Sequence, residues 1–418
     1  MSISKYILFL SFLLLVIISS SCLKSKKTGI PPEVLQILNN SGIHKPDLLK
    51  VILAFQKPED SVKLKSAYFL IENLESNYYI KITLRDSNEK DVVINFNDFT
   101  DYISIKNQID SIEIISGRLN YRVDSILLDI NNVNSEFLIK HINSVITSQK
   151  NLWNCNYDID TYYNFILPYR VANEEIASNN NHSHNLLISE IRKESDILSI
   201  SMRINKAINK EIIYDSRLEI APNVQSVSVT EENKSGNWCD INLYKIHVLR
   251  SLGIAAALDY TPYFTDSLLG NYTTTVILPD NTEINLPNYE NEKEPYPQGK
   301  TAKVYRRTFK SIPNSLFSIK DKKTHTPPFL GNYNYLDVTN NYLQTDSVSI
   351  DFADTTKYVY LAVYNENSWK PIDWAIAQPD GKAYFYNMGT GIMYMPVVVS
   401  KDSIVPIGEP FLLNPRSP

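Results

Sequence analysis

The first part of the chain after residue 30 carries the apolar spacing of α-helices. Apolar residues recur at intervals of three and four, and prolines stand near the starts of the periodic segments, where a missing N–H costs nothing. This pattern predicts a small helical bundle over residues 31–74. Residues 78–121 alternate more between polar and apolar positions, which predicts a short connection that contains strands. Helical periodicity returns in residues 135–153 and 202–215.

The last part of the chain, after Gly299, has the pattern of an antiparallel β-structure. Strand-length apolar runs alternate with turn sequences in which Gly or Asn can take the positive φ that a tight turn needs. Short strands at this spacing predict a β-sandwich. The four runs are YVYLAVYN, WKPIDWAIAQ, KAYFYNM and IMYMPVVVS.

Between these two parts the pattern changes from helical to extended. Asn237 or Ser235 can cap a helix that begins near Trp238, and Gly253 ends this helix. A short apolar strand follows, and residues 273–286 have the composition of a β-hairpin. The chain as a whole therefore predicts an α+β fold.

The first 22 residues have the pattern of a targeting segment. Lys5 supplies a positive charge, and the apolar run from Tyr6 to Ile18 would be about 20 Å long as a helix, short of the roughly 30 Å hydrocarbon core of a bilayer. Three serines then precede Cys22, as at the cleavage site of a bacterial lipoprotein. We therefore expect residues 1–22 to be a lipoprotein signal peptide, with Cys22 as the lipidated first residue of the mature chain. A plain secretory or anchor segment is the alternative.

The net charge of the chain and its predicted lipid anchor indicate its partners and its location. The chain has 41 Lys and Arg against 46 Asp and Glu, and its net charge of −5 offers no basic face to a phosphate backbone, which argues against nucleic acid as a partner. Acylation would tether a soluble body to a membrane surface. We expect the protein in the bacterial cell envelope, on the outer membrane rather than the inner one, facing either the periplasm or the outside.

The sequence holds no pattern for a metal or a cofactor. It has no glycine-rich phosphate loop, and His182 and His184 stand in an Asn- and Ser-rich loop without a third ligand nearby. We therefore expect no bound metal and no cofactor. The three cysteines, too few for a disulfide framework, are Cys22, Cys155 and Cys239.

Cys239 is the candidate for thiol chemistry. It falls in the first turn of the predicted helix, where unpaired N–H groups and the positive end of the helix dipole favour a thiolate and lower the pKa of the thiol. An isolated cysteine is otherwise most often a small buried apolar residue. A nucleophilic role therefore depends on a partner that can accept the proton.

Residues 236–264, GNWCDINLYKIHVLRSLGIAAALDYTPYF, resemble the core motif of transglutaminase-like domains in the papain-like cysteine superfamily. The resemblance extends to transglutaminase-domain lipoproteins of Bacteroides-type bacteria. It implies Cys239 as nucleophile and a papain-like core over residues 145–300, between a mostly helical region with a strand-containing connection (23–144) and a C-terminal β-sandwich (301–418). Five further segments stand in the family's order: AYFLIENLESNYYI (67–80), ILPYRVANEEI (166–176), AKVYRRTF (302–309), NMGTGIMYMPV (387–397) and GEPFLL (408–413).

The catalytic partners of this family are missing from their expected positions. The resemblance implies a histidine on the strand after the loop and an acidic residue on the next strand, but Tyr272 stands at the histidine position and Asn288 near the acid position. His247 would lie about 12 Å from Cys239 along the helix axis, too far for a hydrogen bond. His325 belongs to a linker of the C-terminal part, and nothing in the sequence directs it toward the cysteine.

Three hypotheses for the function follow. The leading one is a lipid-anchored, degenerate transglutaminase-like protein that binds an envelope peptide or glycan without catalysis, in a groove lined by Asn237, Trp238, Asp240 and Tyr272 beside Cys239. The second is an active cysteine hydrolase or acyltransferase with the same cysteine as nucleophile and an unlocated base. The third is envelope scaffolding through the β-sandwich. A base within about 3.2 Å of the thiol would separate the first two hypotheses.

We predict that the mature protein begins with an acylated Cys22. Mass spectrometry of the membrane fraction should find an N-terminal peptide that carries acyl chains on this residue, and Cys22→Ser should abolish the modification. An unmodified mature terminus at another residue would contradict the prediction.

Overall fold

The computed structural model describes most of the chain. The predicted signal peptide with Cys22 lies outside the described residues, as do Cys155, His182, His184 and His325. Within the described part of the chain, no helix is long and apolar enough to cross a membrane. The described residues are 29–152, 157–176, 196–266, 270–289, 296–297, 299–321, 324, 326–352, 354, 358–400 and 403–415.

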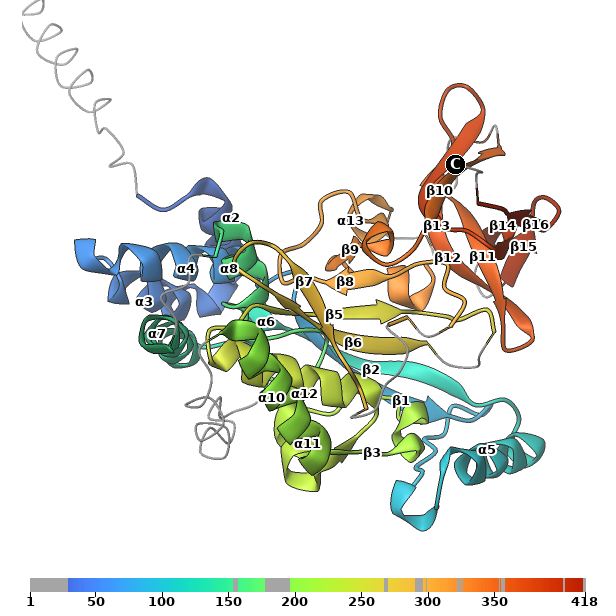
Figure 1. Ribbon diagram of the computed structural model, residues 1–418, viewed down its shortest axis with the longest axis horizontal. Helices are drawn as coiled ribbons and strands as arrows, with labels where there is room; N and C mark the ends of the chain where they lie inside the picture. The colour runs from blue at the N-terminus through green and yellow to red at the C-terminus, as the bar shows by residue number, and fades with distance from the viewer. Residues whose placement is uncertain are drawn as a thin grey trace, which may run out of the picture.

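A helical body forms the N-terminal part of the molecule, at the left of Figure 1. Its helices are α2 (Pro32–Asn40), α3 (Lys45–Ala54), α4 (Ser61–Glu72), α7 (Ser135–Leu152) and α8 (Ile159–Phe165). Helices α2 and α3 each carry a proline in the first turn, as the sequence predicts. Leu38, Val51 and Leu70 belong to the apolar core that these helices share. The helical N-terminal region is therefore confirmed.

A two-stranded antiparallel sheet follows the first helices. Strand β1 (Tyr78–Arg85) pairs with β2 (Asn120–Leu128), and helix α5 (Tyr102–Ser116) lies between them in the sequence. Asp101 and Ser104 form a capping box that fixes the start of α5. Residues 78–121 thus contain strands, as their alternation predicts.

The centre of the molecule is a five-stranded antiparallel sheet in the order β7-β6-β5-β8-β9. Helix α12 packs against this sheet, and helices α10 and α11 lie beside α12 (Figure 1). The sequence of helix, strand and hairpin predicted for this region is confirmed. The bounds are α10 (Ile197–Glu211), α11 (Val227–Asn233), α12 (Trp238–Ser251), β5 (Ala256–Thr261), β6 (Asn271–Ile277), β7 (Glu283–Leu286), β8 (Tyr305–Arg307) and β9 (Tyr335–Asp337).

The two faces of the central sheet have different partners because neighbouring strand residues point to opposite sides. Ala256, Leu258 and Val276 pack in the same apolar core as α12. On the other face, Asp259 is fully buried and accepts hydrogen bonds from Arg306 at 2.7 Å through each of its carboxylate oxygens. Glu283 forms a second ion pair with the same arginine, so a charged network holds this face.

The C-terminal part consists of two antiparallel sheets, drawn in orange and red in Figure 1. Their strands are β10 (Thr345–Asp351), β11 (Tyr358–Asn365), β12 (Ser368–Ile376), β13 (Lys382–Gly389), β14 (Ile392–Ser400), β15 (Ser403–Pro406) and β16 (Phe411–Leu413). Strand β10 pairs with β13, and the other strands form the second sheet. The turns contain Asn367, Gly381 and Gly391 at positive φ, as their sequences predict. One apolar core joins both sheets, which confirms the α+β class with a C-terminal antiparallel sandwich.

The central sheet and the C-terminal sheets are joined by a buried lysine. Lys303 forms ion pairs with Asp337 at 2.6 Å and Asp373 at 3.0 Å, and it donates to the backbone oxygen of Tyr386 at 2.6 Å. Strands β8 and β9 fall within residues 301–418, which the sequence analysis assigns to the sandwich, yet they pair into the central sheet.

Short helical segments and one pair of short strands complete the described structure. The strands β3 (Ile213–Tyr214) and β4 (Ser235–Gly236) pair in parallel next to the start of α12. The helical segments are η1 (Gly42–His44), η2 (Pro58–Asp60), η3 (Phe96–Asp98), α6 (Asp129–Asn132), η4 (Ser216–Ile220), α13 (Leu316–Ile319), η5 (Pro328–Leu330) and η6 (Thr339–Asn341).

We predict that Arg306→Met lowers the free energy of unfolding by about 3–5 kcal/mol, because it leaves the Asp259 carboxylate buried without a counter-charge. The control is Arg122→Met. Arg122 is half exposed and its ion pair with Glu89 lies at the surface, so its substitution should lower the free energy of unfolding by less than about 1 kcal/mol. Urea denaturation measures both values, and equal losses in the two variants would contradict the structural role of Arg306.

Candidate functional site

The start of helix α12 is fixed by a capping box. The Asp240 amide donates to Asn237 Oδ1 at 3.0 Å, and the Asn237 amide donates to Asp240 Oδ2 at 3.1 Å. Asn237 is therefore the N-cap and Cys239 lies in the first helical turn, as the sequence predicts. Cys239 belongs to the same apolar cluster as Tyr272 of β6.

Burial reverses the lowering of the thiol pKa that the helix start favours at Cys239. The side chain is buried, and burial raises the pKa of the thiol well above its usual range. The neighbouring Asp240 carboxylate raises the pKa further, whereas the positive charge of Arg307 lowers it. A helix N-terminus contributes only about 0.3–1 kcal/mol in favour of a negative charge, so desolvation dominates.

Tyr272 lies on β6 directly opposite Tyr260 on β5, and the two rings are stacked with their centroids 6.0 Å apart. Burial raises the pKa of the Tyr272 phenol far above its usual range, and the negative charge of an ionised Cys239 would raise it further. The phenol therefore keeps its proton at neutral pH. Neither the thiol nor the phenol is placed to act as a base for the other.

Asn288 belongs to a neutral hydrogen-bond network next to Tyr272. Its Nδ2 donates to the Tyr272 backbone oxygen at 2.9 Å, and its Oδ1 accepts from Asn242 Nδ2 at 3.1 Å. Thr274 Oγ1 donates to Asn242 Oδ1 at 2.8 Å. The amide groups thus connect the end of the hairpin to Asn242 of α12, three residues after Cys239.

The other residues assigned to the groove take part in local structure. Asp240 is buried and accepts from the amide of Gln225 at 2.9 Å and from its side chain at 3.0 Å. Asn237 Nδ2 donates to the Leu218 backbone oxygen at 3.0 Å. Both side chains therefore hold neighbouring segments against the helix start.

The Trp238 ring contacts the rings of two tyrosines. Its ring stacks on Tyr214 with a centroid distance of 4.5 Å and an angle of 9°, and it meets the Tyr289 ring edge-on at 4.7 Å. Trp238 is only half buried and Tyr289 is 54% exposed. These three rings form an aromatic surface at the start of helix α12, and Trp238 immediately precedes Cys239 in the sequence.

Glu219 is a functional candidate that the sequence analysis missed. Burial raises the pKa of its carboxyl group, while the Tyr214 hydroxyl and the Trp238 amide favour its charged form. One of its carboxylate oxygens is buried without a hydrogen-bond partner, and its charge is near enough to raise the pKa of Cys239. Glu219 comes from the short 3₁₀ helix η4, which is too short to show a periodic pattern in the sequence.

His247 is engaged with a buried carboxylate. Its Nε2 lies 3.0 Å from Glu174 Oε1, and Glu174 also accepts from the amides of Val171 and Ala172 at 2.7 Å each. These contacts give Glu174 a lowered pKa of about 2 in spite of its burial. The structure therefore places His247 in a buried ionic cluster, as a structural side chain.

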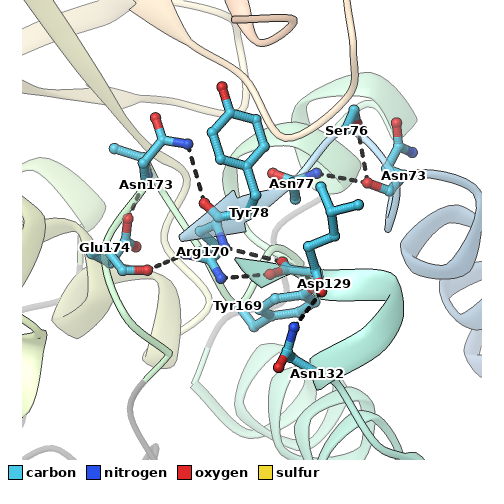
Figure 2. Close-up of polar contacts among 12 residues, drawn as sticks. Asn73, Ser76, Asn77, Tyr78, Asp129, Asn132, Tyr169, Arg170, Asn173 and Glu174 are labelled. Atoms are coloured by element: carbon cyan, nitrogen blue, oxygen red, sulfur yellow. Dashed lines mark hydrogen bonds and ion pairs between the residues drawn. The ribbon is translucent and has the colours of Figure 1, made fainter. Parts of the chain in front are cut away.

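Figure 2 shows the same cluster extending from Glu174 to Asp129. Arg170 is buried and binds Asp129 through Nη2 at 2.6 Å and Nε at 3.0 Å, and its Nη1 donates to the backbone oxygen of Glu174. Tyr169 donates to Asp129 at 2.9 Å. A cavity of about 250 Å³ adjoins the cluster and is lined by Tyr79, Leu127, Asp129, Asn132, Val133, Asn134, Phe137, Arg170, Glu175 and Ile176.

No family model and no curated protein matches this chain. A solved structure described as a "putative cysteine protease" from Cytophaga hutchinsonii is similar over 38% of this chain, with 12% sequence identity and a TM-score of 0.20. The match spans 58% of that protein's length.

Among the described residues, no group of three or more His, Cys, Asp or Glu side chains could hold a metal ion.

We predict that the free energy of unfolding falls as the pH drops from 7 to 5, through His141. Burial and the nearby charges of His247 and Arg250 lower the pKa of His141 to about 4, whereas an unfolded histidine titrates near 6.5. The unfolded chain therefore binds a proton that the native chain does not, which costs roughly 2 kcal/mol of stability by pH 5.

His141→Gln should flatten this slope, whereas His44→Gln, at a half-buried position in η1, should leave it in place. Urea denaturation at pH 7, 6 and 5 provides the measurement. The same slope in His141→Gln as in the parent chain would show that His141 is not its source.

Proposed function

We propose that this protein is a lipid-anchored component of the bacterial cell envelope, whose transglutaminase-like domain binds peptide or glycan without catalysis. The observation that carries the proposal is the state of Cys239. The thiol is buried in one apolar cluster with Tyr272, burial raises its pKa, and Tyr272 and Asn288 stand where the family resemblance implies a histidine and an acid.

Thiol catalysis needs two things that this site does not supply. The nucleophile must be a thiolate, and a general acid must protonate the leaving group, which contributes about 10²–10⁴-fold to the rate. A buried thiol and a phenol whose pKa is raised by burial provide neither. The residues around Cys239 therefore support binding more than bond cleavage.

The described histidines near helix α12 are bound to other groups. His247 pairs with Glu174, and His141 Nε2 lies 2.6 Å from the backbone oxygen of Leu167. His182, His184 and His325 lie outside the described residues. The envelope location and the lipid anchor rest on the sequence of residues 1–22 alone.

The binding role is supported by the side chains exposed around the helix start. Trp238 and Tyr289 offer aromatic surface beside the buried thiol, and the half-buried Arg307 offers a positive charge. Aromatic rings and a guanidinium are side chains that commonly recognise peptides and sugars.

Glu219 favours a second candidate, an active hydrolase or acyltransferase with Cys239 as nucleophile. A carboxylate with a raised pKa and an unpartnered oxygen has the properties of a general base. If this candidate is right, wild-type activity on generic amide or ester substrates should disappear in Cys239→Ala and fall strongly in Glu219→Gln.

We predict no thiol-dependent hydrolysis or transamidation by the wild-type protein, because Cys239 is buried with a raised pKa and Tyr272 stands at the position where the family resemblance implies a histidine. Tyr272→His combined with Asn288→Asp should introduce weak activity on peptide amide or ester substrates, since it restores the side chains that the family resemblance implies. Activity is measured by product release, with wild-type protein assayed in parallel.

The control for this gain is the triple variant that also carries Cys239→Ala, which should be as inactive as the wild type. Robust wild-type turnover that Cys239→Ala abolishes would refute the non-catalytic proposal. Folding of each variant is checked by circular dichroism, because Asn288 takes part in the amide network with Asn242.

A further inference from the structure

Two consecutive arginines on β8 have opposite surroundings. Arg306 is saturated by Asp259 and Glu283 on one face of the central sheet. Arg307 points to the other face and is half buried, and within the described chain it makes no ion pair and no side-chain hydrogen bond. The five N–H donors of this guanidinium are therefore left for water or for a ligand.

Arg307 lies at the Cys239 site. Its guanidinium carbon is 5.4 Å from the centre of the Tyr260 ring, and Tyr260 stacks on Tyr272. The positive charge of Arg307 lowers the pKa of Cys239, Tyr260 and Tyr272, so all three groups are within its electrostatic reach. The arginine and the thiol thus belong to one site, at the end of the sheet face that α12 covers.

A second unpaired donor lies beside this arginine. Tyr260 is 5% exposed, and its hydroxyl group is buried without a hydrogen-bond partner. Buried polar groups are nearly always paired, and leaving one unpaired costs about 1–3 kcal/mol. The unpaired hydroxyl and the guanidinium that lies over the same ring are both donors, and an acceptor-only group such as a carboxylate could pair with them.

We propose that Arg307 binds the carboxylate of a peptide at the Cys239 site. This inference rests on the proposed function, because it names the ligand class of that site. The carboxylate comes from the C-terminus of the peptide or from an acidic side chain, and the chemistry of recognition is the same for both.

A peptide fits these residues better than a sugar does. Sugar rings bind by stacking on free aromatic faces, but here Arg307 covers one face of Tyr260 and Tyr272 stacks on this ring. The Trp238 ring is likewise stacked on Tyr214. The groups left for a ligand at Arg307 are hydrogen-bond donors and a positive charge.

The test uses three pools of N-acetylated tripeptides with matched composition, and saturation-transfer NMR measures binding. One pool has a free C-terminus and no acidic residue, the second is amidated and contains one Glu, and the third is amidated without Glu. Wild-type protein should bind the first or the second pool at least tenfold more tightly than the third. Arg307→Gln should remove this preference, since a charge-assisted hydrogen bond accounts for about tenfold or more in affinity.

Two matched variants serve as controls. Arg307→Lys keeps the charge and should retain part of the preference, and Arg122→Gln removes an exposed arginine of β2 and should retain all of it. Equal binding of the three pools by wild-type protein, or an unchanged preference in Arg307→Gln, would overturn the proposal. Arg307-dependent binding of an oligogalacturonate with no binding of any peptide pool would overturn the assignment to peptides.

The outcomes separate this inference from the proposed function. If the carboxylate preference is absent and wild-type protein still shows no thiol-dependent turnover, the ligand class is wrong and the non-catalytic role stands. Turnover by wild-type protein contradicts the proposed function whatever the peptide pools show.

Discussion

The burial of helix α12 between the central sheet and the neighbouring helices is the constraint on which the rest of the structure depends. The helix is buried on nearly every side, including its polar residues Asn242, Lys245 and Arg250. Each of these needs a partner inside the protein, because an unpaired buried polar group is costly. Arg250 donates to the backbone oxygens of Ala256 at 3.0 Å and Arg170 at 3.1 Å, so the end of the helix is tied both to β5 and to the ionic cluster of Figure 2.

The same burial decides the chemistry of the cysteine. A cysteine at a helix start can be a strong nucleophile when water or a cation stabilises its thiolate. Here the sheet and the capping residues surround Cys239, and the nearest side-chain charge along the chain is the negative one of Asp240. The element that gives the molecule its core thus also keeps the thiol protonated.

Local features were predictable from the sequence, whereas properties that depend on the packing of distant segments were not. The cap at Asn237, the helix that begins at Trp238 and the hairpin of β6 and β7 follow from short-range patterns and are confirmed. The helix start alone favours a lowered pKa for Cys239, but burial by residues far along the chain outweighs the helix dipole and raises the pKa. Glu219 could not be found, since a 3₁₀ helix as short as η4 shows no periodicity from which to place a side chain.

The pairing of β8 into the central sheet has a consequence for how this chain can vary. Arg306 and Arg307 are adjacent, yet one belongs to the charged network with Asp259 and the other to the site of Cys239. A shift of β8 by one residue in one direction would set Tyr305 in the place of Arg306 and leave the Asp259 carboxylate without its counter-charge, and a shift in the other direction would set Thr308 in the place of Arg307. The register of β8 against β5 is therefore constrained: side chains here can change one at a time, but a shift by one position would remove either the counter-charge of Asp259 or the arginine on the opposite face.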